Sequence, residues 1–169
     1  MSAVENWNPQ DPVSSFRRFA EGLRDLSRDI FLRDGTHAEM FFMISEDGHG
    51  YMILAPAKME RDEMVELLRK RICEEKTYGV VHIVESWTYI PKTRGDHTLK
   101  QIVQGEIAVS ELQPSDRSEA LVVMAETRSG WQMKWMSLIR RDGDKISLSS
   151  TVEFDERSGG RFAGLFEAG

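Results

Sequence analysis

The alternation of apolar runs and turn residues is clearest in the last third of the chain. Residues 119–127, 131–140 and 145–154 are apolar-rich runs separated by short breaks. The second break contains Asp142-Gly143, and an Asp-Gly pair between apolar runs favours a tight hairpin because glycine takes positive φ without steric cost. We therefore expect a three-stranded antiparallel meander here.

A second hairpin is predicted near the N-terminal third. Residues 39–45 and 51–55 are both apolar, and the intervening Glu46-Asp47-Gly48-His49-Gly50 is polar and rich in glycine. Runs of this length flanking a glycine-containing turn are typical of paired strands. A long β-branched and aromatic run at 80–90 predicts a further strand.

Two helices are predicted from apolar residues at three- and four-residue spacing. The first begins at Asp11-Pro12, a capping residue followed by proline, and ends at Gly35. The second covers 59–74, with acidic residues in its first turn and basic residues in its last, which suits the helix dipole. The apolar stripe of the first helix is Phe16, Phe19, Ala20, Leu23, Leu26 and Ile30, and that of the second is Met64, Leu68 and Ile72.

These elements predict one α+β domain over residues 1–169. A single, mostly antiparallel sheet of about six strands would be covered by the two amphipathic helices, both on one face because each carries a single stripe. Residues 1–10 show no period and are expected to be a loose arm. Residues 91–118 give the weakest secondary-structure signal in the chain. Residues 156–169 form a glycine-rich tail that still carries Phe162, Leu165 and Phe166.

Composition narrows the function classes. The net charge is −6, which disfavours a broad basic surface for nucleic acid. No secretory signal and no membrane-length apolar run occurs, which favours a cytoplasmic location. With Cys73 as the one cysteine, an internal disulfide is excluded.

Motifs for common chemistry are missing from the sequence. The four histidines, at 37, 49, 82 and 97, have no metal-ligand spacing. No glycine-rich phosphate loop connects a strand to a helix, and no Gly-x-Ser-x-Gly occurs. We therefore expect no metal and no cofactor.

One set of polar residues accompanies the long predicted strand. Glu85 shares its strand face with Ile83 and Trp87, where a carboxylate is costly unless it is paired. Arg117 is the expected partner, with Trp87 stacked on the guanidinium. Candidate catalytic residues are Glu85, Asp116, Arg117 and Glu119, and candidate binding residues are His82, Trp87 and Arg117. The cluster is either a ligand cleft or a structural ion pair that fixes a loop to the sheet.

Three segments carry a resemblance to a known family. Asp34-Gly35-Thr36-His37, Glu85-Ser86-Trp87 and the run from Pro114 to Leu121 resemble a pattern in small bacterial and phage-borne proteins. In those proteins a Glu-x-Trp segment precedes a proline-led Asp-Arg-x-Glu segment and an apolar strand. The resemblance implies a common fold over residues 30–140 and no particular reaction.

Three functions remain open. The first is a non-catalytic binding or assembly module of bacterial or phage origin, with a protein partner or a second copy of the chain, because an unpaired outer strand and an apolar tail need cover. The second is a small enzyme using the Glu85 and Arg117 cluster. The third, a nucleic-acid-associated factor, would use the arginines of the first helix, Arg17, Arg18, Arg24 and Arg28, and the acidic balance counts against it.

Overall fold

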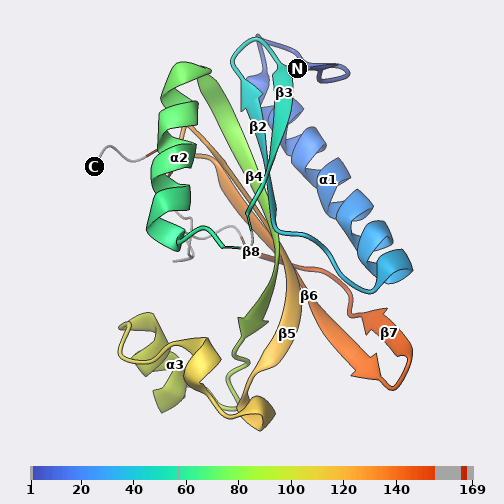
Figure 1. The fold of residues 1–169 in the computed structure, drawn as a ribbon, viewed down its shortest axis with the longest axis vertical. Helices are drawn as coiled ribbons and strands as arrows, with labels where there is room; N and C mark the ends of the chain where they lie inside the picture. The colour runs from blue at the N-terminus through green and yellow to red at the C-terminus, as the bar shows by residue number, and fades with distance from the viewer. Residues whose placement is uncertain (1, 57, 155–164, 167–169) are drawn as a thin grey trace.

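One curled antiparallel sheet organises the chain in a computed structural model (Figure 1) that describes residues 2–56, 58–154 and 165–166. The strands lie in the order β1-β3-β2-β4-β5-β6-β7, with β8 also paired to β6. Their bounds are β1 Ser2–Ala3, β2 Met40–Ser45, β3 His49–Leu54, β4 Thr77–Thr88, β5 Ser118–Thr127, β6 Gln132–Asp142, β7 Lys145–Leu148 and β8 Val152–Phe154. The helices are α1 (Pro12–Asp34), α2 (Arg61–Glu74) and α3 (His97–Val103). The predicted α+β class with a mostly antiparallel sheet is confirmed.

The predicted meander is present, with one difference in its third run. β5 pairs with β6 from Ala120 to Glu126, and β6 also pairs with β7 and with β8. Gly143 has φ 56° in the tight turn between β6 and β7, as the Asp-Gly pair predicted. The run 145–154 is therefore two short strands, because the polar segment 149–151 leaves the ladder between them.

The β2–β3 hairpin has a shorter turn than the sequence suggested, since β3 already begins at His49. Gly48 has φ 83° and donates to the Ser45 carbonyl at 3.0 Å. The ring of Trp7 covers this glycine, and any side chain there would overlap the indole. The N-terminal residues, in which the sequence shows no period, are thus packed on the hairpin, and β1 pairs with β3.

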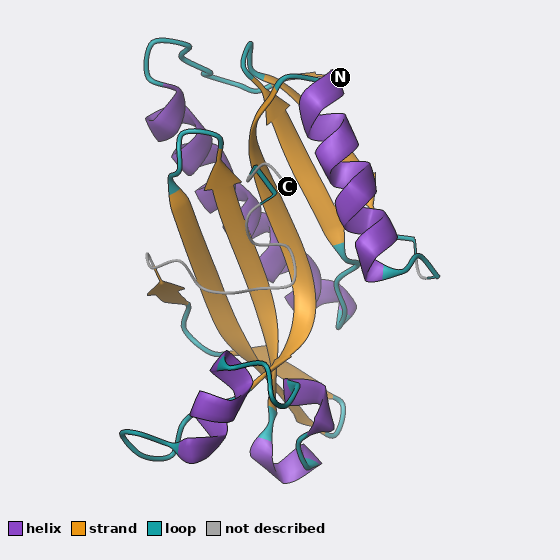
Figure 2. Cartoon of the chain, turned by 90° about the vertical axis from the view of Figure 1, so that its left-hand side faces the viewer, coloured by secondary structure: helices purple, strands orange, loops and turns teal. Residues whose placement is uncertain are grey.

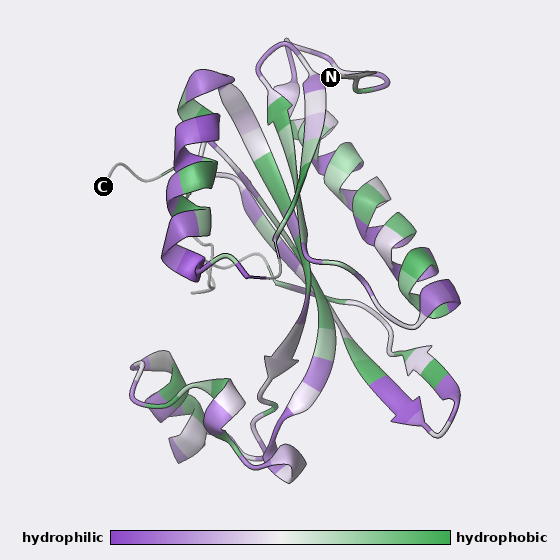
Figure 3. Ribbon diagram, viewed as in Figure 1, coloured by the Kyte–Doolittle hydropathy of each residue, from purple (hydrophilic) through white to green (hydrophobic). Residues whose placement is uncertain are grey.

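The two long helices lie on opposite faces of the sheet, so the prediction that they share one face is wrong (Figures 1 and 2). α1 packs on a cluster that includes Val81 and Ile83, whereas α2 packs on Val80, Phe41 and Met43. Neighbouring residues of a strand point to opposite faces. β2 and β4 therefore contribute apolar side chains to the cores on both faces of the sheet (Figure 3). The single apolar stripe of each helix does not show which face of the sheet that helix covers.

Both helices begin and end largely as expected. The Asp11 side chain accepts from the Ser14 N–H at 3.2 Å, and Gly35 ends α1 with φ 75°. The buried stripe of α1 continues through Ser27 and Phe31, so the predicted Leu26 lies on the outer side at 52% exposure. In α2, Met64, Leu68 and Ile72 are buried as predicted.

The C-terminal apolar residues partly cover the α2 face. Leu165 is 5% exposed and belongs to the α2 cluster, and its N–H donates to Glu126 Oε1 at 2.9 Å. Phe166 packs against the same cluster, while Phe162 lies outside the described residues. This part of the tail rests on the chain's own sheet.

Most of the segment 91–118, which has the weakest secondary-structure signal in the sequence, forms a small lobe beyond the end of β4. It contains α3 and two single 3-10 turns, at Val109–Glu111 and Pro114–Asp116. The Asp96 side chain caps α3 by accepting from the N–H groups of Thr98 and Leu99. None of the described helices has the length and apolar character that a membrane span requires.

Candidate functional site

Arg141, near the end of β6, holds together the loop after α1 and strands β4 and β5. Its Nη2 lies 3.3 Å from Glu85 Oε2, and its Nε lies 2.9 Å from Glu119 Oε2. Nη1 donates to the Gly35 carbonyl at 3.0 Å. The hydrogen bond to Glu119 raises the pKa of Arg141, so the guanidinium remains charged. It therefore offsets two carboxylates on the α1 face of the sheet.

Glu85 is fully engaged by these groups. Its side chain is 18% exposed. Besides Arg141, its carboxylate accepts from the Thr36 hydroxyl at 2.8 Å and from the backbone N–H of His37. A carboxylate held by several donors is stable in a half-buried position without any ligand. The geometry fits an ion pair that fixes the α1–β2 loop to the sheet.

The predicted pairing of Glu85 with Arg117 is wrong. Arg117 lies just before β5, and its Nη1 donates to the Ser110 carbonyl at 2.5 Å. Its guanidinium lies 4.3 Å from the centre of the Trp87 ring, which matches the predicted stacking. Arg117 therefore belongs to the lobe, where it anchors the 3-10 segment to the exposed indole at the end of β4.

The other candidates do not complete a cleft. Asp116 pairs with Lys92 at 2.9 Å in the lobe. His82 is 3% exposed and lies on the α2 face, where its Nε2 is 2.9 Å from Glu39 Oε1. Its ring stacks on Phe41 with centroids 4.3 Å apart. Because residues 82 and 85 occupy opposite faces of β4, the sheet separates His82 from the Glu85 cluster.

Sequence reasoning missed Arg141, Thr36 and Glu39 as partners in these clusters. Arg141 is the last residue but one of β6, and no local pattern marks it as an ion-pair partner. The β5–β6 register provides the one usable signal: Ala120 lies opposite Leu138, which sets position 141 diagonal to Glu119. Diagonal neighbours on adjacent strands are within reach of a long side chain.

The arginines of α1 are bound within the chain. Arg17 pairs with Glu21 at 2.9 Å, and Arg24 pairs with Asp25 at 2.8 Å. Arg28 donates to the Ser149 carbonyl and Thr151 hydroxyl, and Arg18 donates to the Ser15 hydroxyl. Each of these guanidinium groups therefore has a partner within the chain.

The outer edge of β3 is a different kind of feature, because past Gly50 no described strand pairs with it. The Ala55 N–H donates to the Glu39 carbonyl, so Tyr51, Ile53 and Ala55 direct their backbone groups toward β2. By the alternation of an antiparallel ladder, Met52 and Leu54 direct theirs outward. β1 covers this edge only as far as Gly50.

The open part of the edge is also apolar. Met52 is 51% exposed and Leu54 is 54% exposed. No Asp, Glu, Lys or Arg occurs from His49 to Ala55. Natural edge strands usually carry such charges, a proline or a bulge that prevents pairing with another strand. From His49 to Ala55, β3 has no charged residue, no proline and no bulge, and the first proline is Pro56.

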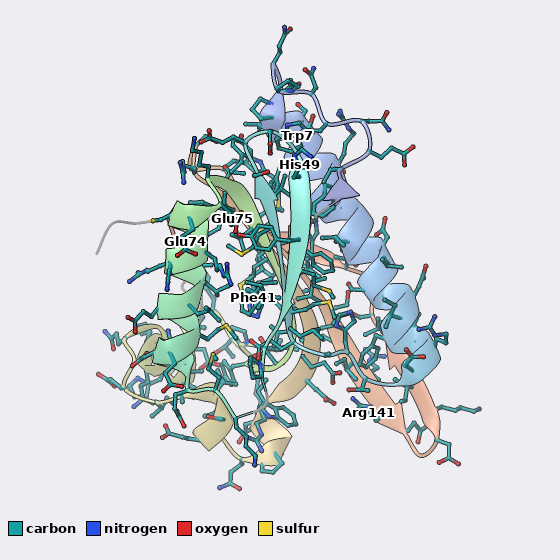
Figure 4. The ribbon with its side chains drawn as sticks, turned by 45° about the horizontal axis from the view of Figure 1, so that its top comes forward. Trp7, Phe41, His49, Glu74, Glu75 and Arg141 are labelled. Carbon is teal, nitrogen blue, oxygen red and sulfur yellow. The ribbon has the colours of Figure 1, made fainter. Side chains whose placement is uncertain are left out.

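A groove lies beside this edge on the α1 face. Its volume is about 560 Å³, and its apolar walls include Phe19, Phe42 and Met52. Arg18 and Glu5 are its charged lining residues. Figure 4 shows Trp7 and His49 close together at this end of the sheet, with Arg141 toward the opposite end. None of the groups bound to Arg141 lines this groove.

Metal binding finds no support in the part of the chain that the structure describes. No group of three or more His, Cys, Asp or Glu side chains there is arranged to hold a metal ion. His49 instead lies 3.0 Å from Asp47 in the β2–β3 turn. Hydrogen bonds from Ser45 and His49 lower the pKa of Asp47 to about 2.

Comparison with known proteins identifies the family. No curated protein and no solved structure matched the chain. The family model described as bacteriophage lambda protein ea47 matches residues 9–168, which is nearly the whole sequence. This agrees with the resemblance to phage-borne proteins carried by residues 34–37, 85–87 and 114–121. The chain belongs to the bacteriophage lambda protein ea47 family.

Proposed function

We propose that this phage-family protein is a non-catalytic binding module that takes up an extended protein segment along the outer edge of β3. The single observation that carries the proposal is the coincidence, at Met52 and Leu54, of outward backbone groups and exposed apolar side chains. In strand addition, backbone hydrogen bonds give affinity and alternate side chains give specificity. Both requirements are present at this edge.

The groove supports the same function. An added strand would run beside the cavity of about 560 Å³ lined by Phe19, Phe42 and Met52. Alternate side chains of that strand would point toward this apolar surface, because they share the face of Met52. The bound segment would therefore be apolar at every second position.

The polar clusters leave little to support an enzyme. Glu85 and Glu119 are bound by Arg141, and Asp116 is bound by Lys92. These pairs connect elements of the fold. None of these residues lines the groove at Phe19, Phe42 and Met52, so the binding proposal accounts for more of the surface.

A synthetic peptide tests strand addition directly. A fluorescent peptide with the sequence of residues 49–55 should bind the full chain and raise its anisotropy. The same peptide with every backbone nitrogen methylated should bind weakly, because it has no amide donor left for the ladder. Met52→Lys should weaken binding of the unmodified peptide, whereas Leu26→Lys, at a site of equal exposure on α1, should not. Equal binding by both peptides would contradict strand addition.

A further inference from the structure

The β3 edge is complementary to itself. Met52 and Leu54 both direct backbone groups outward, and the residues are separated by one position. When two copies of the strand meet antiparallel about a two-fold axis at Ile53, Met52 of each copy faces Leu54 of the other. Both members of each pair then have free donors and acceptors, which is the requirement for a hydrogen-bonded antiparallel pair.

The neighbouring registers pair fewer of these backbone groups. Centring the axis on Met52 would place Leu54 opposite Gly50, whose outward groups are paired with Ser2 of β1. Centring it on Leu54 would place Met52 opposite Pro56, which has no N–H to donate, so the Met52 carbonyl would stay unpaired. A shift by a single residue would set outward groups opposite inward ones. With Ile53 on the axis, every outward group of Met52 and Leu54 is paired. The pairing ends at Leu54, because Gly50, which lies opposite Pro56, is already held by β1.

The side chains fit the same arrangement. Met52 and Leu54 of both copies would lie on the α1 face and cover each other, adjoining the apolar walls at Phe19 and Phe42. No charged residue from His49 to Ala55 would oppose its counterpart. A symmetric interface that uses one patch twice is the commonest way for a soluble chain to assemble.

We propose that the partner of the β3 edge is a second copy of this chain, joined in a two-fold dimer through antiparallel β3–β3 pairing with Ile53 on the axis. This inference rests on the proposed strand-adding function and specifies its partner. The two sheets become one continuous sheet across the dimer. The partner that covers Met52 and Leu54 is then the same edge of another molecule.

A cysteine on the axis tests the register. In a Cys73→Ser background, which removes the native thiol, Ile53→Cys sets two cysteines opposite each other in a non-hydrogen-bonded pair. The Cα atoms of such a pair are about 4.5 Å apart, which is within disulfide range. Mild oxidation should give a disulfide-linked dimer. Met52→Cys and Leu54→Cys in the same background should link much less, because neither position faces itself.

The mass of the full chain in solution provides the second measurement. Light scattering over a concentration series should give twice 19.4 kDa for the wild type and for Leu26→Lys. Met52→Lys should remain at 19.4 kDa and melt at the temperature that the wild type shows when dilute, since the side chain is exposed and only the gain from association is lost. A monomeric wild type throughout, or preferential linkage through position 52 or 54, overturns the dimer.

The two proposals fail in distinguishable ways. If the wild type is monomeric and yet binds the 49–55 peptide, strand addition stands and its partner is a different protein. If the wild type neither dimerises nor binds the peptide, both proposals fall. If a dimer forms whose mass is unaffected by Met52→Lys, the copies meet at another surface and the β3 dimer is overturned.

Discussion

Arg141 Nη2 lies 3.3 Å from Glu85 Oε2 and connects the β6–β7 hairpin to the middle of the sheet. The guanidinium also bonds Glu119 and the carbonyl of Gly35, at the end of α1. Three segments distant in sequence therefore depend on one side chain. Its role is to hold the α1–β2 connection against the sheet.

Replacing Arg141 by alanine should lower the free energy of unfolding by about 1–3 kcal/mol, because Glu85 and Glu119 would lose their cation in a half-buried position. Arg140→Ala is the matched control, since Arg140 is exposed and makes no ion pair with any described residue. The control should change stability by less than about 0.5 kcal/mol. Urea denaturation of both variants measures the difference, and equal midpoints would show that the cluster contributes nothing.

The sequence made part of this cluster predictable. Alternation along β4 placed Glu85 on an apolar face and so required a partner, which the structure confirms in Arg141. The identity of that partner depends on the β5–β6 register, and a register is a tertiary property that no local pattern records. Arg117 was adjacent to β5 in sequence, but its side chain is held in the lobe by Trp87 and Ser110.

The fold was predictable to a similar extent. Helix caps at Asp11 and Gly35 and the turn at Gly143 act locally, and each appears as expected. The placement of α2 opposite α1 was not predictable from the helices, because a stripe shows that a helix is covered and not which sheet face covers it. The open β3 edge was also hidden, since the chain order does not reveal that β3 lies near the outside of the sheet.

Gly79 should be intolerant of any side chain. A Cβ at this position would overlap the ring of Phe16, where α1 crosses β4. Gly79→Ala should therefore destabilise the fold by about 1–3 kcal/mol through overpacking. Gly22→Ala is the matched change on α1, where a Cβ meets no atom within 4 Å, and it should stabilise by about 0.5–1 kcal/mol. Thermal melts that shift in the same direction for both variants would contradict this packing.

Asp47 should titrate far below an ordinary aspartate. Hydrogen bonds from Ser45 and His49 lower its pKa to about 2 in the folded chain, against about 3.9 in an unfolded one. A lowered folded pKa means that the carboxylate stabilises the β2–β3 turn at pH values above about 3.9. This contribution is lost as the pH falls through about 2. NMR titration of the Asp47 carboxyl carbon should give a midpoint near 2, and a midpoint near 3.9 would show that the turn is not held in this way.

The central claim, that the edge of β3 pairs with another strand through its backbone, is tested most directly by residue-resolved amide hydrogen exchange. In dilute chain, the amides of Met52 and Leu54 should exchange fast, while those of Tyr51 and Ile53, which face β2, stay protected. In concentrated chain, the amides of Met52 and Leu54 should become protected as well. Fast exchange at these two residues, unchanged between dilute and concentrated chain and unchanged by a saturating excess of the 49–55 peptide, would contradict the account.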